Sequence, residues 1–292
     1  PRSTQGVSSA ASDVYKRQAS LEASGGEIKA GSPVNEILIK NNKSYGMVLE
    51  NGDEIYANKI VSNLDVKRTF LKVVEKKELP EDFYNAVKKF KIRGSSGKLN
   101  IALDDLPIWK SIPEGDPAGT GDLHITQSIE EMEGAYDDWK DGRWSSLPYV
   151  DMCIPSINDP TMAPQGKHYM SVFVQYVPYN LADGGWTEEK RLEFGKHVMS
   201  RIGNYSTNFN DIINHAEIRT PKELEQEVGL TEGNIFQGEL TMDQLMFNRP
   251  IPGYAQYKTP IKNLYLCGSG THPGGGLHGT NGFNAAREIL KG

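Results

Sequence analysis

The sequence predicts a mixed fold, α/β plus α+β, and three observations indicate it. Short apolar strands separated by turns run from Glu27 to Asn63, as in a β-meander. A strand, a glycine-rich loop and a helix occupy residues 258–292. Between them, residues 66–257 mix strands with separate helices, which is typical of an α+β domain. We therefore expect residues 66–257 to be inserted between two parts of another domain, 19–65 and 258–292.

The first of these parts alternates apolar and polar residues between turn signals. Strands are predicted over residues 34–39, 45–49 and 54–61. Asn41-Asn42 and Asn51-Gly52 lie at the turns, and Asn-Gly between strands is a strong hairpin signal. The end of this part, Ile60–Asn63, is more apolar, so we expect it to enter a larger sheet.

The middle region carries clear helix-start signals. Phe83, Val87 and Phe90 follow Pro80 at helical spacing and predict a helix over residues 80–90. Further helices are predicted to begin after Ser128, Thr187 and Thr220, the one after Thr187 burying a stripe that includes Leu192, Val198 and Ile202. Strands are predicted at residues 98–103, 122–126 and 168–176.

The glycine-rich loop contains a G-x-G-x-x-G spacing at Gly274, Gly276 and Gly279. A dinucleotide fingerprint opens a βαβ unit and is followed by an acidic residue about 20 positions later. The chain ends at residue 292, so we reject that interpretation. The loop instead predicts a second wall of a nucleotide site, with Thr280 or Asn281 capping the last helix. The alternative is a turn that only packs the helix against the strand.

Composition excludes several classes of partner. The formal net charge of −6 argues against nucleic acid and against an anionic membrane surface as obligate partners. No apolar run reaches the roughly 20 residues of a membrane span, and no signal peptide is recognised. The two cysteines, Cys153 and Cys267, suit a reducing compartment, so we expect a cytoplasmic protein, with peripheral membrane contact left open.

Residues 1–18 have no initiator methionine and no apolar period. They resemble translated sequencing-adapter sequence, and we expect them to be an artefactual leader. The chain is then expected to be the C-terminal part of a longer protein.

Eight short motifs occur in a characteristic order along the chain. They are Gly25-Gly-Glu-Ile28, Pro33-Val-Asn-Glu-Ile37, Ile60-Val-Ser-Asn-Leu-Asp65 with Arg68-Thr-Phe70, Asp159-Pro-Thr-Met-Ala-Pro164, Thr220-Pro-Lys-Glu-Leu-Glu225, Gly233-Asn-Ile-Phe-Gln-Gly-Glu239, Asn248-Arg-Pro250 and Tyr265-Leu-Cys-Gly-Ser-Gly-Thr-His-Pro-Gly-Gly-Gly276. In this order the motifs resemble the C-terminal portion of the phytoene desaturase-like FAD-dependent oxidoreductases.

The resemblance implies a glutathione-reductase-type FAD domain that is interrupted by a substrate-binding domain. The N-terminal Rossmann units, with their G-x-G-x-x-G, are missing from this chain, so the fragment alone is expected to be inactive. The resemblance places Val34 against the adenine, and Ser62 and Asn63 near the adenosine and pyrophosphate. It places the remaining cofactor residues, from the C-terminal part, along the pyrophosphate, ribityl chain and flavin: Gly268, Ser269, Gly270, Gly279, Thr280 and Asn281.

The implied activity is hydride transfer with FAD, as desaturation or saturation of an apolar, polyene-like small molecule. Such chemistry needs no general acid or base, so no catalytic residue is nominated, and the electron acceptor is unknown. The residues predicted to line the substrate site are Tyr169, Phe173, Tyr176, Phe236 and His272. Ordinary core packing is the alternative for each aromatic residue.

Other interpretations stay open. Arg249 is expected either to meet a pyrophosphate or acidic substrate, or to be a structural arginine bridging the two domains. His272 and His278 with Cys267 do not have a recognised zinc spacing, so no metal is expected. The chain could also be a non-catalytic binding or scaffolding homologue, or an amine oxidase-like flavoenzyme acting on a polar substrate.

Overall fold

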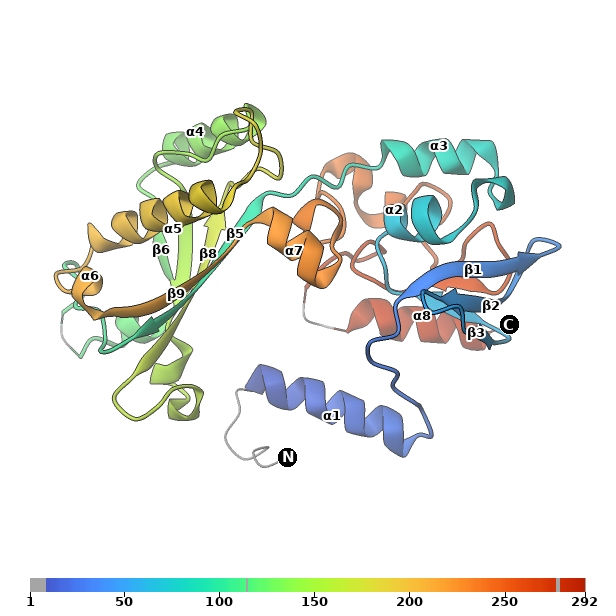
Figure 1. Cartoon of the computed structure of the whole chain (residues 1–292), viewed down its shortest axis with the longest axis horizontal. Coiled ribbons are helices and arrows are strands. Elements are labelled where there is room, and N and C mark those ends of the chain that lie inside the picture. The colour runs from blue at the N-terminus through green and yellow to red at the C-terminus, as the bar shows by residue number, and fades with distance from the viewer. Residues whose placement is uncertain (1–8, 114, 277–278, 292) are drawn as a thin grey trace. The chain divides into compact units, whose positions relative to one another are not determined.

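The structure, a computed structural model, describes residues 9–113, 115–276 and 279–291 (Figure 1). The chain divides into two compact units. Unit 1 contains residues up to 28 and residues 95–223, and unit 2 contains residues 29–94 and those from 224 onward.

Unit 1 is built on a five-stranded antiparallel sheet with the order β6-β7-β8-β5-β9. Its helices and strands are α1 (Ser9–Ala23), β5 (Ser96–Leu103), β6 (Leu123–Ile125), α4 (Ile129–Lys140), β7 (Tyr149–Cys153), β8 (His168–Gln175), α5 (Glu188–Gly203), α6 (Phe209–Ile212) and β9 (Ile213–Arg219), with short 3₁₀ turns at Pro117–Thr120, Pro155–Ile157 and Pro160–Met162. Helix α7 (Pro221–Val228) crosses the boundary to unit 2.

One face of this sheet forms the core of unit 1. Along β8, Met170, Val172 and Val174 are fully buried, while the intervening side chains are half-buried on the opposite face. Helix α5 lies along the buried face (Figure 1) and contributes Phe194 and Val198 to the same core. The strand and helix predictions for this region are confirmed, although Leu192, predicted in the buried stripe of α5, is 42% exposed.

Unit 2 contains two small sheets, a three-stranded antiparallel meander β1-β2-β3 and a parallel pair β10-β4. Its helices and strands are β1 (Val34–Lys40), β2 (Lys43–Leu49), β3 (Glu54–Tyr56), β4 (Ile60–Ser62), α2 (Val66–Arg68), α3 (Glu81–Lys89), β10 (Leu264–Leu266) and α8 (Thr280–Leu290). A π-helical turn at Thr69–Val73 and 3₁₀ turns at Lys76–Glu78, Thr231–Gly233, Met242–Gln244 and Met246–Asn248 complete it.

The predicted meander is confirmed. Asn41 and Asn42 both have positive φ, of 52° and 57°, as a two-residue hairpin turn requires. The third predicted strand divides in two, because β4 leaves the meander and pairs in parallel with β10. The segment Ile60–Asn63 was expected to enter a larger sheet. It does leave the meander, but the sheet that it enters has two strands in the described residues.

The inserted unit is narrower than the predicted range of 66–257. Residues 66–94 and 224–257 group with unit 2 instead. The reason is apolar packing, because Val66, Phe70 and Phe83 share a core with Ile60 and Leu264. The mixture of helix and strand patterns in the sequence predicted an α+β region. It did not indicate which of the two cores each helix would join.

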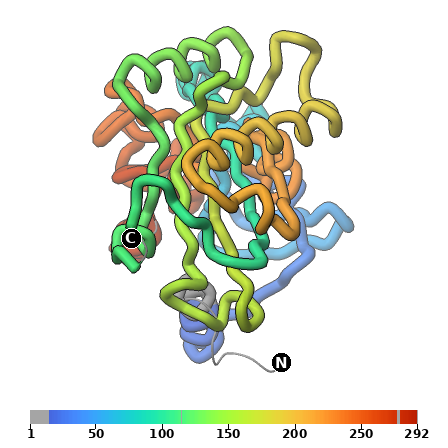
Figure 2. Tube along the Cα trace, turned by 90° about the vertical axis from the view of Figure 1, so that its left-hand side faces the viewer, coloured from blue at the N-terminus to red at the C-terminus, as the bar shows by residue number. Residues whose placement is uncertain are grey.

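Helix α1 includes many of the residues expected to be an artefactual leader. It runs from Ser9 to Ala23, a segment rich in good helix formers such as alanine, lysine, arginine, glutamine and leucine. Figure 2 shows this helix in dark blue near the N-terminal end of the trace. An apolar stripe is therefore not needed for this segment to be helical.

Candidate functional site

Two parallel strands end side by side in unit 2. Ser62 of β4 pairs with Leu266 of β10, and the N–H of Cys267 donates to the Ser62 carbonyl at 2.9 Å. Each strand then runs into a loop, at Asn63 and at Gly268. In sheets of parallel strands, ligands bind beyond the carboxyl ends of the strands. The two loops therefore mark the position where a ligand site is expected.

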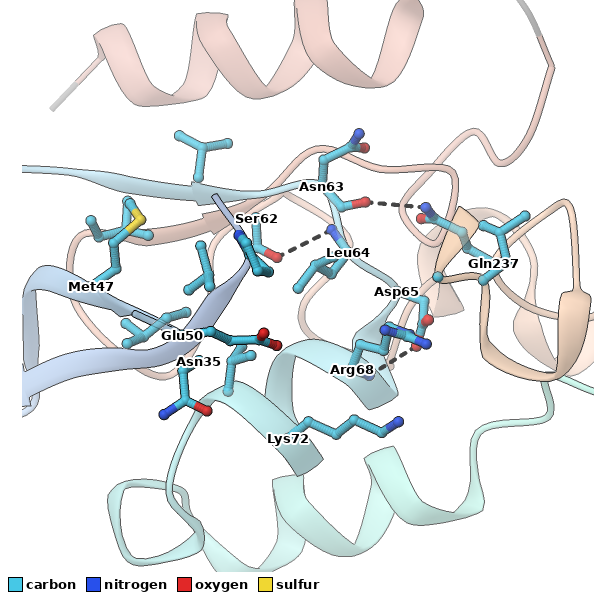
Figure 3. A pocket seen from close by; sticks show the side chains of 18 of the residues that line it. Asn35, Met47, Glu50, Ser62, Asn63, Leu64, Asp65, Arg68, Lys72 and Gln237 are labelled. Atoms are coloured by element: carbon cyan, nitrogen blue, oxygen red, sulfur yellow. Dashed lines mark hydrogen bonds between the residues drawn. The ribbon is translucent and has the colours of Figure 1, made fainter. Parts of the chain in front are cut away.

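A cavity of 710 Å³ opens at the carboxyl end of β4 (Figure 3). Val34, Ser62 and Asn63, which the sequence analysis grouped, all line it. They come from the first strand of the meander and from the end of β4, so the fold brings together residues about thirty positions apart. Their predicted contacts with adenosine remain a prediction.

Two cations line the same cavity and were not predicted from the sequence. Arg68 and Lys72 follow β4 in a helical segment, four residues apart (Figure 3). Residues four apart lie on one face of a helix, so the spacing of Arg68 and Lys72 was the sequence pattern from which they could have been predicted. The Nε atom of Arg68 is buried and has no hydrogen-bond partner among the described residues.

Asp65 also lines the cavity, but its carboxylate holds the local structure. It accepts the Arg68 main-chain N–H at 2.9 Å, capping α2, and the Thr231 hydroxyl at 2.6 Å. The side chain is nearly fully buried. Asp65 therefore fixes the chain around the cavity. The other charged side chains of the lining are Glu50, Arg68 and Lys72.

Gly268, Ser269 and Gly270 begin the glycine-rich loop directly after β10. A Cβ on Gly268 would lie 2.4 Å from Gln237 Oε1 and 2.7 Å from the Asn63 carbonyl, so only glycine fits. Gln237 ties the two loops together, because its Nε2 donates to the Asn63 carbonyl at 3.1 Å and its Oε1 accepts from Gly270 N–H at 3.0 Å. Gln237 was not predicted as a site residue, although it lies in a quoted motif.

The start of α8 differs from the prediction. Its N-cap is Gly279, with φ of 65° and no capping side chain, so neither Thr280 nor Asn281 is the cap. Asn281 is buried and donates from Nδ2 to the carbonyls of Thr271 at 3.0 Å and Gly268 at 3.2 Å. Its amide is used to hold the glycine loop against the first turn of the helix.

Arg249 has a structural role within unit 2. It is fully buried, and its guanidinium donates to the carbonyls of Phe236 at 2.7 Å, Ser269 at 3.0 Å and Glu239 at 3.2 Å. Burial lowers the pKa of Arg249 to about 10. Of the two roles left open by the sequence, the structure favours a structural arginine, and the partners named here all lie in unit 2 rather than in two domains.

The residues predicted to contact substrate fall in both units. Tyr169 and Phe173 are half-buried and share one face of β8 in unit 1. Tyr176 follows β8 and packs edge-on against Tyr136, with ring centroids 5.3 Å apart. It therefore belongs to an aromatic cluster with α4.

The other two predicted substrate residues lie beside the glycine loop in unit 2. The ring of Phe236 leaves no room for a Cβ at Gly275, at 2.2 Å, so it packs on the loop. The ring of His272 stacks on Phe247, with centroids 6.4 Å apart, and its buried Nδ1 has no partner among the described residues. His278 lies outside the described residues.

Within the described ranges, no helix combines the length and the apolar character that crossing a bilayer requires. In the same part of the chain, no group of three histidine, cysteine or acidic side chains is placed to hold a metal ion.

The known proteins that the chain matches include an oxidoreductase domain-containing protein and a desaturase. The chain is 36% identical to pyridine nucleotide-disulfide oxidoreductase domain-containing protein 2 of Rattus norvegicus, over 98% of this chain and 50% of that protein. It is 26% identical to a 4,4'-diapophytoene desaturase of Methylomonas, over 88% of this chain and 47% of the relative. The chain thus spans about half the length of the curated relatives it matches. No family model matches it.

Among solved structures, the fold resembles that of a putrescine oxidase double mutant from a redesign of cofactor binding. The TM-score is 0.58 at 12% identity, over 95% of this chain and 52% of the other. This likeness concerns the fold alone, which has mixed α/β content. The relatives confirm the resemblance to phytoene desaturase-like oxidoreductases predicted from the motifs.

Proposed function

We propose, on the premise that the chain resembles the phytoene desaturase-like FAD-dependent oxidoreductases, that it supplies one half of an FAD site. The complete protein would then be a flavin-dependent oxidoreductase. The observation that carries this proposal is the cavity at the carboxyl end of β4, where Val34, Ser62 and Asn63 meet.

The cavity fits the adenosine diphosphate half of the cofactor. Its 710 Å³ falls within the range of about 300–1,000 Å³ that is usual for small-molecule sites. Arg68 and Lys72 supply positive charge to the lining. A phosphate oxygen would satisfy the buried Arg68 Nε, because a charge-assisted hydrogen bond to an anion offsets the cost of burying that donor.

The glycine loop suits the flavin half. Gly268 and Gly270 let the loop pack closely against Gln237, which holds it beside Asn63 at the end of β4. Among the described residues, a Cβ at Gly279 would meet nothing within 4 Å. We assign Gly268–Gly270 and Gly279–Asn281 to this part of the cofactor, where the helix N-terminus stabilises negative charge.

When bound, the flavin supplies hydride transfer. The chain's own residues hold the cofactor and exclude water. We propose a lipophilic, polyene-like small molecule as substrate, by analogy with the desaturase among the relatives, and oxidation or reduction of a C–H or C=C bond as the reaction. The aromatic side chains Tyr169 and Phe173 of β8 would contact it.

The parallel pair β4–β10 supports the view that the rest of the flavin domain lies elsewhere. Two parallel strands form an unusually small sheet, because parallel sheets are normally larger and covered on both faces. Val61, in the middle of β4, is 45% exposed. We propose that further strands of the complete protein extend this sheet and that the chain alone is inactive.

The test is calorimetric titration of the 292-residue chain with FAD and, separately, with ADP. We expect weak but saturable binding of both, and Arg68→Met should weaken each about tenfold or more. Arg143→Met is the matched control, because Arg143 is exposed in unit 1 and forms ion pairs with Asp138 and Asp141.

Equal ADP binding by the wild-type chain and Arg68→Met would overturn the assignment of the cavity. A second arm joins the chain to the part of the rat relative that precedes the aligned region. Retained flavin absorbance in that protein supports the proposal. Loss of the flavin on gel filtration would favour a non-catalytic binding module.

A further inference from the structure

The five-stranded sheet of unit 1 has a second face that the core does not use. Strand register places Lys98, Phe173 and Asp151 side by side across β5, β8 and β7. One step along, Asn100 and Ser171 are neighbours in the same way. These side chains are half-buried. The face is therefore neither an ordinary solvent-exposed face nor an apolar one.

Lys98 is the unusual member of this face. Its ammonium donates to the Ser171 hydroxyl, and it forms no ion pair with any described residue. Arg219, the cross-strand neighbour of Lys98 on β9, is a second cation of this face and is paired with Glu217 at 2.8 Å. A lysine ammonium has three N–H donors, so two remain for another acceptor.

Two carboxylates lie on this face, and neither forms an ion pair with Lys98. Glu217 of the adjacent strand β9 is bonded to Asn100 and Arg219 instead. Asp151 lies on β7, with Phe173 of β8 between the two strands, and it lies within 3.7 Å of His124. Burial lowers the pKa of Lys98 below the ordinary value of 10.5, because the ammonium has lost part of its hydration. A partly buried charge is stabilised by an opposite charge and hydrogen bonds.

The aromatic side chains beside Lys98 supply an apolar surface. Phe173 is the direct cross-strand neighbour of Lys98. Tyr169 lies on the same face of β8, and its hydroxyl is held by Asn100 Oδ1 at 2.8 Å, which leaves the ring as the part available for contact. A cation with a hydroxyl, next to two rings, matches a ligand with one anionic end and an apolar body.

We propose that this face binds an organic carboxylate, with the carboxylate on Lys98 and Ser171 and the apolar body on Phe173 and Tyr169. One part of this inference rests on the proposed function, namely that the ligand is the redox substrate. It refines the lipophilic substrate proposed above into an amphiphilic one with an acidic end. The binding itself needs no flavin.

The test is calorimetric titration of the full chain, without FAD, using trans-cinnamate and the neutral cinnamyl alcohol as probes. We expect saturable binding of cinnamate and binding about tenfold or more weaker for the alcohol. Lys98→Met should weaken cinnamate binding by a similar factor, and Lys98→Arg should retain most of it. Lys196→Met is the control, because Lys196 is exposed on α5.

Circular dichroism of each variant establishes that it is folded. Equal binding of the acid and the alcohol, or equal loss in Lys98→Met and Lys196→Met, would overturn the site, as would absence of saturable cinnamate binding. These outcomes do not depend on the ADP titration of unit 2. Failure of that titration alone would overturn the assignment of the cavity in unit 2 and leave the carboxylate site of unit 1 standing.

Discussion

The five-stranded sheet of unit 1 and the glycine-rich return of unit 2, residues 234–276 and 279–281, are stabilised in different ways. The sheet satisfies its main-chain groups through regular strand pairing and buries an apolar face beneath α5. The return has little regular structure, so polar side chains bond its main chain instead. They are Asn234, Gln237, Gln244, Arg249 and Asn281. Buried main-chain groups need partners, and a segment without strands or helices must obtain them from side chains.

The largest effect is expected in the apolar core beneath the sheet of unit 1. Phe194→Ala removes a fully buried ring from the core beneath the sheet. We expect a loss of about 4 kcal/mol in the free energy of unfolding, measured by chemical denaturation. Leu192→Ala on the exposed side of the same helix should change it by less than about 0.5 kcal/mol. Similar losses in both variants would mean that α5 does not depend on this core.

The matching test in the return is Arg249→Met. It keeps an apolar stem but leaves several buried carbonyls without a donor, so we expect a loss of about 3 kcal/mol. Hydrogen exchange should rise in residues 236–244 and 268–271 while β5 and β8 stay protected. Arg249→Lys should not restore protection, because one ammonium cannot replace the forked guanidinium. Unchanged exchange in the return would contradict this role.

The smallest effect concerns pH. Burial alone would raise the pKa of Glu239, but its hydrogen bonds with Arg93, at 2.6 Å, bring it below the ordinary value of 4.5. A lowered carboxyl pKa stabilises the fold above 4.5, and this contribution is lost as pH falls through the lowered value. Because Arg93 is half exposed, the loss should stay below about 1 kcal/mol.

Thermal unfolding of the wild type and Glu239→Gln, from neutral pH to below 4.5, measures this contribution. The two melting temperatures should converge as the pH falls. A constant difference between them would show that the pair with Arg93 adds no pH-dependent stability.

The same contrast explains what could be predicted from the sequence. Period-two alternation predicted β8, and the turn residues Asn41-Asn42 predicted the first hairpin, because strand signals are local. Thr220 with Glu223 predicted the start of α7, and the Thr220 hydroxyl does bond that carboxylate. Val34, Ser62 and Asn63 meet in one cavity, as the motifs grouped them.

The remainder depended on contacts between residues far apart in the chain. No local pattern indicates that Gln237 joins Asn63 to Gly270, or that Arg249 binds carbonyls on several segments. The division between the units was predicted too broadly for the same reason, since α3 looks alike whichever core it joins. The sequence indicated only that Lys98 belongs to a strand. The cross-strand register determined which side chains lie beside it.

The parallel pairing of β4 with β10 also has a consequence for the order of events in synthesis and folding. Asn58 and Asn263, which are hydrogen-bonded beside this pair, are 205 residues apart in the chain. During translation, β4 therefore leaves the ribosome long before its partner exists, while all five strands of unit 1 are made in between. Contacts this distant form slowly, because the chain loses loop-closure entropy before they form. Unit 2 should thus mature last, with β4 a target for chaperones until the C-terminal segment has been made.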